Sequence, residues 1–448
     1  MMNYQEAWAF LDNLQFFKIK LGLESMGQFL DSVGNPQRAL RFIHVAGTNG
    51  KGSVSTILLT ILAKAGYRAG LYTSPHLNSV RERFRINDRF ISEEDFAELA
   101  STIRDVLGDR QITYFEFTTA LALLWFAREQ VDVAILEVGM GGRLDATNVV
   151  LPLIGVITNV TMDHEQYLGN TLTAVSGEKA GIIKEGVPVI SGVAPDESRT
   201  VVEAVSRERN APLLLLGRDF KVDRLSGGNW NYQGAGEEGW KLQNLRCGLK
   251  GAYQVNNSAL ALATLEQLAN VYPVSEEAIR EGLASVRWPG RLEYFCLVEG
   301  REVDCPEEGE QEMNSSVRRY LLDGAHNPDG VESLKSALEQ EFAYDRLILV
   351  WACMADKDVA KTLHAVSHLA DRIVFTRPES ERSATSEALT ALLPEAERHK
   401  ALASPTVAGA LALAADLAHG NDLICVAGSL YLVGAARQIL LGDVVRGG

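Results

Sequence analysis

The sequence predicts an α/β protein of two units, a larger one with a mostly parallel sheet and a smaller α/β unit after it. Short β-branched runs alternate with helical patterns over most of the 448 residues. A glycine-rich turn separates the first such run from the helix that follows, and a second series of runs begins after residue 290. Continuous apolar strands that alternate with helices are typical of a parallel sheet covered on both faces.

The strands expected in the first unit are short apolar runs, at residues 41–47, 68–74, 131–139, 153–160 and 187–192. Helices are expected over about 51–66, where apolar residues recur on one face, and over about 254–269. Between these helices, the glycine- and aromatic-rich segment 225–240 predicts hairpins or loops.

The segment Trp288-Pro289-Gly290-Arg291 interrupts the chain before the pattern repeats. We therefore expect two domains, residues 1–290 and 291–448. The strands expected in the second domain span residues 320–324, 346–352, 372–377 and 422–428. Residues 298–318 are acidic and poor in apolar residues, which predicts an exposed loop between two strands.

The composition indicates which kinds of partner and which cell compartment to expect. The net charge is −15 and the pI is about 5.1, which disfavours nucleic acid and anionic lipid as partners. No apolar run approaches the roughly 18 residues of a membrane span, and the N-terminus lacks the pattern of a signal peptide. The cysteines are widely spaced without a CxxC pair, which predicts reduced thiols in a cytoplasmic protein. They are Cys247, Cys296, Cys305, Cys353 and Cys425.

The glycine-rich turn spans Gly47 to Ser53 and predicts a phosphate-binding loop. Such a turn points backbone N–H groups and the positive end of the helix dipole at one place. Lys51 adds a cation for the β- and γ-phosphates, and Ser53 offers a hydroxyl to Mg²⁺. Because Gly52 separates Lys51 from Ser53, the spacing differs from that of GTPases and transport ATPases. The alternative is a strand-to-helix turn with an incidental lysine.

Motifs along nearly the whole chain resemble, in order, those of the folylpolyglutamate synthase/dihydrofolate synthase family within the Mur ligase superfamily. They are HVAGTNGKGS, LYTSPHL, RERFRIN, YFEF, LEVGMGGRLDATN, TMDHEQYLG, EKAGIIK, WPGRLE, LDGAHNPDG and AGSLYLVG. The resemblance implies a central ATPase domain with a phosphate loop, joined to a smaller Rossmann-like C-terminal glutamate-ligase domain. The active site is then expected in the cleft between the two.

The activity implied is ATP-dependent addition of L-glutamate through an acyl phosphate. The acceptor is dihydropteroate, the γ-carboxylate of tetrahydrofolate, or both, and the products are dihydrofolate and folylpolyglutamates. The segments 74–77 and 145–148 favour both activities, whereas Lys20 stands where bifunctional members often carry an acid. A folylpolyglutamate synthase alone, another Mur-type amide ligase, and an ATP-dependent switch remain alternatives. A peptidoglycan-type ligase is disfavoured because the phosphate loop begins at residue 47. The resemblance also implies a monomer.

The same resemblance implies roles for individual residues. Nucleotide contacts are assigned to Thr48, Asn49, Gly50, Lys51, Gly52, Ser53, Asn257, Arg291, Asp323 and His326. Two Mg²⁺ sites are implied, the first held by Ser53, Ser74 and Glu137, and the second by His164 with a carbamylated Lys179. Lys51, Glu137, His164 and Lys179 are the expected catalytic residues. For Asn257, Arg291, Asp323 and His326 the alternative roles are caps, turns and interdomain salt bridges, and an unmodified Lys179 would be a lysine on a helix surface.

The acceptor site is the last part that the resemblance implies. Phe115, Glu116, Leu144, Asp145 and Ala146 correspond to pterin or pteroate contacts in bifunctional members. Phe115 is equally consistent with a core position. Arg83 is expected to meet a substrate carboxylate, or else only to pair with Glu82 or a neighbouring acid.

Overall fold

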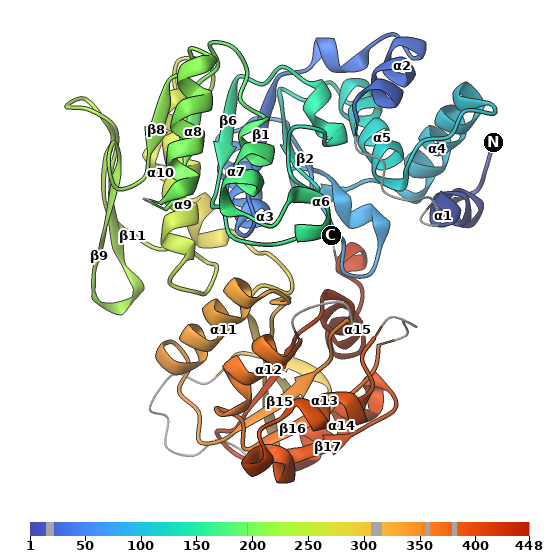
Figure 1. The fold of residues 1–448 in the computed structure, drawn as a ribbon, viewed down its shortest axis with the longest axis vertical. Helices are drawn as coiled ribbons and strands as arrows, with labels where there is room; N and C mark the ends of the chain where they lie inside the picture. The colour runs from blue at the N-terminus through green and yellow to red at the C-terminus, as the bar shows by residue number, and fades with distance from the viewer. Residues whose placement is uncertain (15–21, 195, 306–315, 355–358, 379–382, 448) are drawn as a thin grey trace.

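The computed structural model describes residues 1–14, 22–194, 196–305, 316–354, 359–378 and 383–447. Figure 1 shows two α/β units one above the other, with the chain from blue to yellow in the larger unit and from orange to red in the smaller. The predicted fold class is therefore confirmed. Lys20 and the part of the acidic segment from 306 to 315 lie outside the described residues.

The larger unit contains an eight-stranded sheet in the order β4-β3-β2-β5-β1-β6-β7-β8. Its strands pair in parallel except at one edge, where β3 pairs antiparallel with both β2 and β4. The bounds are β1 Phe42–Ala46, β2 Ala69–Tyr72, β3 Phe84–Ile86, β4 Arg89–Phe90, β5 Val133–Glu137, β6 Ile154–Ile157, β7 Val189–Ser191 and β8 Leu213–Leu215. Because β1 lies between β5 and β6, the loops that follow these three strands meet at one edge, where α/β proteins bind ligands.

Both faces of this sheet are buried, as the apolar runs predict. Successive residues of β5 point to opposite faces: Ile135 packs in one apolar cluster and Leu136 in another. The helices of the larger unit are α1 Tyr4–Asn13, α2 Glu24–Ser32, α3 Lys51–Lys64, α4 Glu93–Leu107, α5 Tyr114–Arg128, α6 Glu165–Leu168, α7 Leu172–Ala180, α8 Glu197–Glu208, α9 Gln254–Gln267 and α10 Glu276–Ser285. Of these, α3, α9 and α10 pack together on the face that includes Ile135.

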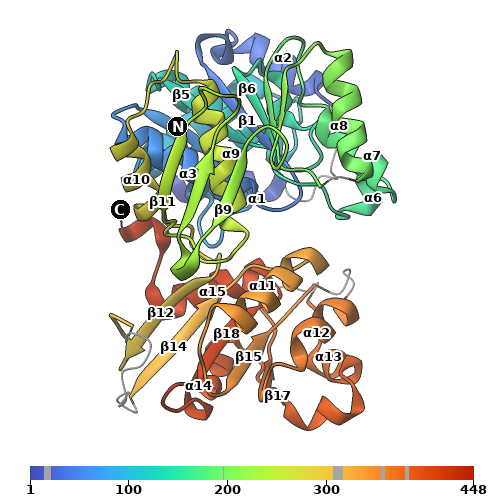
Figure 2. The ribbon, with the colours of Figure 1, turned by 90° about the vertical axis from the view of Figure 1, so that its left-hand side faces the viewer.

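The glycine-rich segment forms hairpins, as predicted. Strands β9 (Lys221–Arg224), β10 (Trp230–Gln233) and β11 (Lys241–Leu245) make a separate antiparallel sheet. Figure 2 shows this sheet at the front of the larger unit, beside α9. The side chains of Trp230 and Tyr232 are buried in the cluster that α3 and α9 form, so the aromatic residues anchor the hairpins to the sheet.

The smaller unit contains a seven-stranded sheet in the order β13-β12-β14-β18-β15-β16-β17. Its strands are β12 Glu293–Val298, β13 Arg301–Val303, β14 Val317–Leu322, β15 Leu347–Trp351, β16 Arg372–Phe375, β17 Ala401–Ala403 and β18 Leu423–Ala427. Its helices are α11 Pro328–Gln340, α12 Val359–Ser367, α13 Ser386–Leu392, α14 Val407–Leu417 and α15 Leu430–Leu441. The five strands from β14 to β17 are parallel, and helices cover both of their faces.

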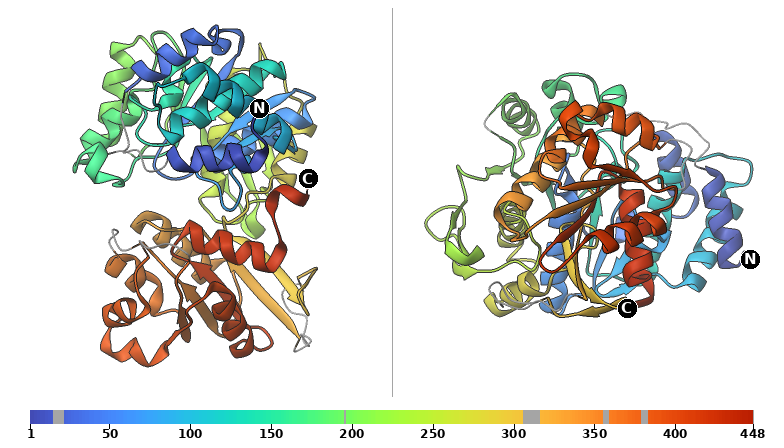
Figure 3. Two further views of the ribbon diagram at one scale, coloured as in Figure 1. Left: turned by 90° about the vertical axis from the view of Figure 1, so that its right-hand side faces the viewer. Right: turned by 90° about the horizontal axis from the view of Figure 1, so that it is seen from below.

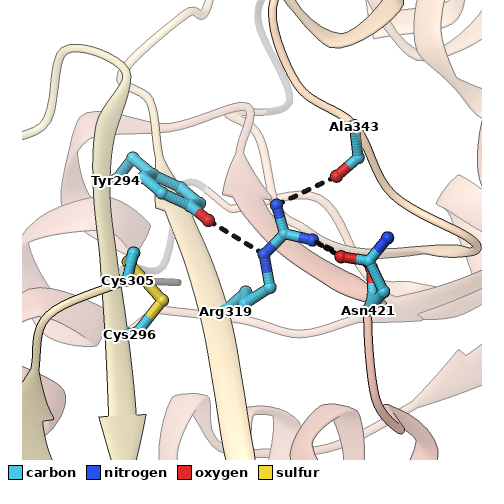
Figure 4. Close-up of a disulfide and its surroundings, with 6 residues drawn as sticks. All are labelled: Tyr294, Cys296, Cys305, Arg319, Ala343 and Asn421. Carbon is cyan, nitrogen blue, oxygen red and sulfur yellow. Dashed lines mark hydrogen bonds between the residues drawn. A yellow bond between two sulfur atoms is a disulfide. The ribbon is translucent and has the colours of Figure 1, made fainter. Parts of the chain in front are cut away.

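The acidic segment 298–318 is only partly the loop that was expected, because β13 within it pairs with β12. This hairpin brings Cys296 and Cys305 together with a Cα–Cα distance of 5.2 Å, and the two form a disulfide (Figure 4). The expectation that all cysteines are reduced is therefore wrong for this pair. Spacing along the chain did not indicate it, since the turn of the hairpin, rather than a short motif, sets the distance. Cys247, Cys353 and Cys425 take no part in this disulfide.

The end of the chain returns from the smaller unit to the larger one. After α15, the 3-10 turn η7 (Val444–Gly447) contacts the 3-10 turn η3 (Val80–Arg83), and Figure 3 shows the red segment rising toward the larger unit. The two units are thus joined by both the 288–292 segment and the C-terminal turn. No helix among the described residues is long and apolar enough to cross a membrane.

Candidate active site

The predicted phosphate loop connects β1 to the start of α3. Gly47 has φ of 152°, and a Cβ there would lie 1.8 Å from Thr158 Oγ1, so only glycine fits. Gly50, with φ of 82°, is the N-cap of α3, and a Cβ there would lie 2.6 Å from Asn257 Oδ1. The loop is fixed against the β6 loop, where Thr48 N donates to Asn159 O (3.1 Å) and Asn49 N to Asn159 Oδ1 (2.8 Å).

Two lysines converge on this loop. Lys51 Nζ donates to Gly47 O (3.1 Å) and Thr48 O (3.0 Å), and Lys179 Nζ donates to Gly47 O (3.0 Å) from α7, 132 residues away. Lys179 is 3% exposed, so the alternative of a surface lysine is wrong. Burial and then the charge of Lys51 lower the pKa of Lys179 to about 7, although Asp163 and Asp145 act in the opposite direction.

Ser53 is held by two residues of α9. Gln254 Nε2 donates to Ser53 Oγ (3.2 Å), and Asn257 Nδ2 donates to Gln254 Oε1 (2.8 Å). All three side chains are buried. Asn257 therefore lies at the loop as predicted. The contact of Gln254 was not predicted, because nothing in the sequence indicates which residue of α9 faces Ser53.

Glu137 ends β5, and its side chain is 4% exposed. Its Oε2 accepts a hydrogen bond from Ser74 N (3.2 Å), next to the cis peptide between Ser74 and Pro75. Burial raises the pKa of Glu137, while the charges of Lys51, Arg291 and Arg83 lower it. A buried carboxylate beside two serines is an oxygen donor set of the kind that Mg²⁺ accepts when phosphate and water complete the shell.

His164 lies on the other side of the loop, at the start of α6, with φ of 52°. Its side chain is 49% exposed, and its Nε2 lies 3.9 Å from Asp163 Oδ2. Lys51, Asp163 and His164 line one cavity. Among the described residues no three His, Cys, Asp or Glu side chains gather as a metal cluster, so any cation here would depend on serine, phosphate or a modified lysine as well.

The smaller unit reaches the phosphate loop through the segment before α11. Asn49 Nδ2 donates to Asp329 Oδ2 (2.7 Å), and Asn327 Nδ2 donates to Asn49 Oδ1 (3.2 Å) and Asp163 Oδ2 (3.1 Å). Sequence analysis did not single out Asn327 and Asp329, although both belong to the DGAHNPDG motif. Their partners are 164 to 280 residues away, so only the packing of the two units brings them together.

Asp323 and His326 flank this contact. Asp323 is 4% exposed and accepts hydrogen bonds from Leu292 N (2.8 Å) and Ala325 N (2.9 Å), and burial raises its pKa. His326 Nδ1 lies 2.7 Å from Gly324 O. Asp323 thus fixes the connection between the units as well as facing the cavity.

One cavity of about 290 Å³ brings all of the predicted nucleotide residues together. Its lining includes Thr48, Asn49, Gly50, Lys51, Gly52, Ser53, Ser74, Glu137, His164, Asn257, Arg291, Asp323 and His326. A second cavity, of about 610 Å³, adjoins it and shares Pro75, Trp288, Arg291 and Leu430 with it. The larger unit contributes the phosphate loop and the smaller unit closes the opposite side.

The predicted acceptor residues do not all have free side chains. The Glu116 carboxylate accepts hydrogen bonds from Thr113 N (2.7 Å) and Thr113 Oγ1 (2.8 Å), and Thr113 and Glu116 form a capping box at the start of α5. The Ser25 hydroxyl also donates to Glu116. The observed contacts of Glu116 are therefore those of a helix cap. The sequence held a signal for this, since Thr113 and Glu116 have capping-box spacing.

Phe115 and Asp145 converge on Gly139, two residues after Glu137. A Cβ at Gly139 would lie 2.5 Å from Phe115 Cζ. Asp145 accepts from Gly139 N and Met140 N, both at 3.0 Å, and burial raises its pKa. Leu144 is half-buried and Ala146 is buried beside it. Phe115 also packs against the core of the larger unit, so both roles considered for it have structural support.

Among the described residues, Arg83 forms an ion pair neither with Glu82 nor with another acid. Its side chain is 8% exposed, and its Nε donates to His76 Nδ1 (2.9 Å). The guanidinium lies 5.2 Å from the centre of the Tyr114 ring. Glu82 accepts instead from Leu77 N (2.8 Å) and neighbouring backbone N–H groups. Burial and the charge of Arg83 lower the pKa of His76 to about 3.

Comparison with known proteins places this geometry in a family. The Mur ligase middle domain matches residues 45–265, and the Mur ligase glutamate ligase domain matches residues 311–430. The folylpolyglutamate synthase of Lacticaseibacillus casei is 34% identical over 98% of this chain and 99% of its own length. The dihydrofolate synthase/folylpolyglutamate synthase of Bacillus subtilis is 33% identical, with 98% and 99% covered.

A longer relative and two solved structures agree. The probable bifunctional folylpolyglutamate synthase/dihydropteroate synthase of Haloferax volcanii is 35% identical over 99% of this chain, but the chain spans only 51% of that protein. The folylpolyglutamate synthase of Thermotoga maritima has a TM-score of 0.82 at 34% identity, with 98% and 97% of the two chains covered. Escherichia coli FolC in complex with DHPP and ADP has a TM-score of 0.83 at 32% identity, with the same coverage. This chain therefore belongs to the folylpolyglutamate synthase/dihydrofolate synthase family of ATP-dependent Mur-type ligases.

Proposed function

We propose that the protein joins L-glutamate to dihydropteroate and to the γ-carboxylate of tetrahydrofolate, with ATP as the energy source. The observation that carries this proposal is the cavity in which Lys51, Ser53 and Glu137 of one unit face Asp323 and His326 of the other. Such a cavity can enclose a nucleotide and hold a carboxylate against its γ-phosphate. Relatives named for one or both activities, over nearly the full length of this chain, support the choice of acceptors.

The reaction needs an activated carboxylate, because its oxygen is a poor leaving group. An acceptor carboxylate oxygen attacks the γ-phosphorus of ATP, the bond to the β–γ bridging oxygen breaks, and ADP leaves. The glutamate amine then attacks the carbonyl carbon of the acyl phosphate and loses a proton as phosphate departs. Lys51 and the N–H groups at the start of α3 stabilise the negative charge that gathers on the phosphates.

We propose two Mg²⁺ sites, in keeping with this chemistry. Ser53, Ser74 and Glu137 would hold the first, and their oxygen donors suit it. His164 and a carbamylated Lys179 would hold the second. When bound, the cations neutralise phosphate charge and polarise the transferring group.

The environment of Lys179 favours carbamylation. With a pKa lowered to about 7, much of its amine is unprotonated near neutral pH and can attack CO₂. A nitrogen–carbon bond forms, one proton is released, and the product is an anion. This change removes the unfavourable proximity of two cations at Gly47 and supplies the ligand that an ammonium cannot.

The domain boundary, the oligomeric state and the position of the acceptor complete the proposed function. We propose that the domains divide at residues 290 and 291, since the first sheet and its helices end before this point and β12 begins directly after it. We propose a cytoplasmic monomer that acts on small molecules. The acceptor would lie along Phe115, Leu144, Asp145 and Ala146, with Arg83 near its carboxylate.

ADP release with each acceptor tests the proposal. Purified protein is incubated with ATP, Mg²⁺ and L-glutamate, and with 7,8-dihydropteroate or tetrahydrofolate. We expect ADP release that requires both glutamate and an acceptor, and a product one glutamate heavier by mass spectrometry. Activity with tetrahydrofolate alone would leave a folylpolyglutamate synthase, and ADP release that needs no acceptor would reject the ligase.

A further inference from the structure

The Arg83 guanidinium is a buried cation without an acidic partner among the described residues. It is 8% exposed, and its hydrogen-bond partner through the side chain is the neutral acceptor His76 Nδ1. A buried charge is costly unless it is paired, so an arginine kept in this state indicates that the missing anion comes from a ligand.

The orientation of Arg83 is fixed from two sides. His76 occupies Nε, and the Tyr114 ring lies against the guanidinium at 5.2 Å. Because His76 Nδ1 accepts, this imidazole carries its proton on Nε2. The two terminal nitrogens of Arg83 donate to no described residue, yet neither is among the fully enclosed polar atoms. The end of the guanidinium is therefore held in place without being fully enclosed by the protein.

The charge of Arg83 is coupled to the candidate magnesium site. The charge of Arg83 acts on Glu137, as the charges of Lys51 and Arg291 do. Tyr114 is the neighbour of Phe115 at the start of α5, and it also interacts with Tyr431, which the smaller unit presents with 63% exposure. Arg83 is thus coupled to Glu137 of the candidate magnesium site and contacts Tyr114, which precedes Phe115 of the candidate acceptor site.

We propose that Arg83, oriented by His76 and Tyr114, binds the α-carboxylate of the terminal glutamate on acceptors that already carry glutamate. This inference rests on the proposed function. Dihydropteroate has one carboxylate, and the reaction consumes it. A folate acceptor has two, so while the γ-carboxylate is activated the α-carboxylate needs a cation of its own. A guanidinium with two free nitrogens suits a carboxylate better than a point charge does.

A comparison of acceptors and variants tests this assignment. Wild-type protein and Arg83→Gln are each assayed with tetrahydrofolate, its α-carboxamide and dihydropteroate. In the wild type, the α-carboxamide should have a KM roughly tenfold to a hundredfold above that of tetrahydrofolate, the range for a lost charge-assisted hydrogen bond. In Arg83→Gln this difference should largely disappear, and the ratio of kcat/KM for tetrahydrofolate to that for dihydropteroate should fall by a similar factor.

Two variants of His76 test whether its hydrogen bond orients Arg83. His76→Gln keeps an oxygen that can accept from Arg83 Nε, whereas His76→Leu does not. We expect the KM for tetrahydrofolate to rise in the Leu variant and to recover in the Gln variant, with kcat little changed in both. Arg81→Lys is the matched control in the same 3-10 turn, because Arg81 already bonds Ile91 O and Glu93. Its acceptor ratio should equal that of the wild type.

The outcomes distinguish this inference from the proposed function. If the wild type ligates glutamate to neither acceptor, the proposed function fails. If it ligates both but shows equal KM values for tetrahydrofolate and its α-carboxamide, only the α-carboxylate assignment fails. The comparison of these two KM values uses the wild-type protein, so it tests the α-carboxylate assignment even if a variant does not fold. Equal losses for both acceptors in Arg83→Gln would likewise overturn the assignment.

Discussion

Lys179→Met should change the pH dependence of stability, because Lys179 titrates at different pH in the folded and unfolded chain. Its pKa falls from 10.5 to about 7 on folding. Between these values the unfolded chain holds a proton that the folded protein has lost, so raising the pH favours the folded state. The wild type should therefore gain stability relative to the Met variant as the pH rises above 7, and lose that gain as it falls back.

The size of the effect follows from the pKa difference. At about 1.36 kcal/mol for each pKa unit, the complete change from below pH 7 to above pH 10.5 is about 5 kcal/mol. Between pH 7 and pH 9, where most proteins can be handled, about 2 kcal/mol of it should be visible. Methionine keeps the apolar stem of the lysine and has no titrating group, so the difference between the two proteins isolates Lys179.

Urea unfolding at pH 7 and pH 9, in buffers free of bicarbonate, measures this difference. The buried indoles of Trp125 and Trp230 report the larger unit, to which Lys179 belongs. The difference between proteins is used, because a chain with two units need not unfold in one step. Lys64→Met, at an exposed position of α3, is the control and should show no such change. A wild-type minus Met difference that stays constant from pH 7 to pH 9 would refute the reasoning.

Three other predictions concern the cavity. Gly52→Ala places a Cβ 2.8 Å from the Trp288 ring, so calorimetry should show ATP binding weakened by roughly tenfold or more. Gly177→Ala, with open space around it, is the control and should bind ATP normally. Equal ATP affinities of the two variants would contradict this prediction. Asp329→Ala removes the partner of Asn49 across the units, so small-angle scattering should report a larger radius of gyration, and an unchanged profile would show that this bond does not hold the units together. EDTA should stop ADP release and Mn²⁺ should restore it; activity that persists in EDTA would exclude an essential divalent cation.

Elements set by local sequence were predicted well. The buried strands, the nucleotide helix and the glycine-rich turn all depend on periodicity or backbone freedom within a few residues. The capping box of Thr113 and Glu116 is equally local. Its spacing is visible in the sequence, although Glu116 was assigned to the acceptor site instead. Short edge strands such as β13 and β17 were not predicted, because three residues carry too little pattern.

In the smaller unit, the disulfide between Cys296 and Cys305 could not be predicted from the sequence. Their spacing of nine residues matched no motif, and only the β12–β13 hairpin brings their Cα atoms to 5.2 Å. Nearby, Arg319 is held by the Tyr294 hydroxyl (2.8 Å), by Ala343 O (2.9 Å) and by the Asn421 side chain (Figure 4). These partners come from distant segments of the chain, and no spacing rule relates them.

The sequence by itself determined the chemistry available to this protein: a loop for phosphates, oxygen-bearing side chains after parallel strands, and two α/β units with an interruption between them. Only the tertiary structure decided how those groups act on one another. It buried Lys179 against Gly47, placed Gln254 on Ser53, joined Asn49 to Asp329, and left Arg83 oriented but unpaired. The reason is physical, since burial and charge proximity depend on which distant side chains pack together, and these set pKa values and ligand preference.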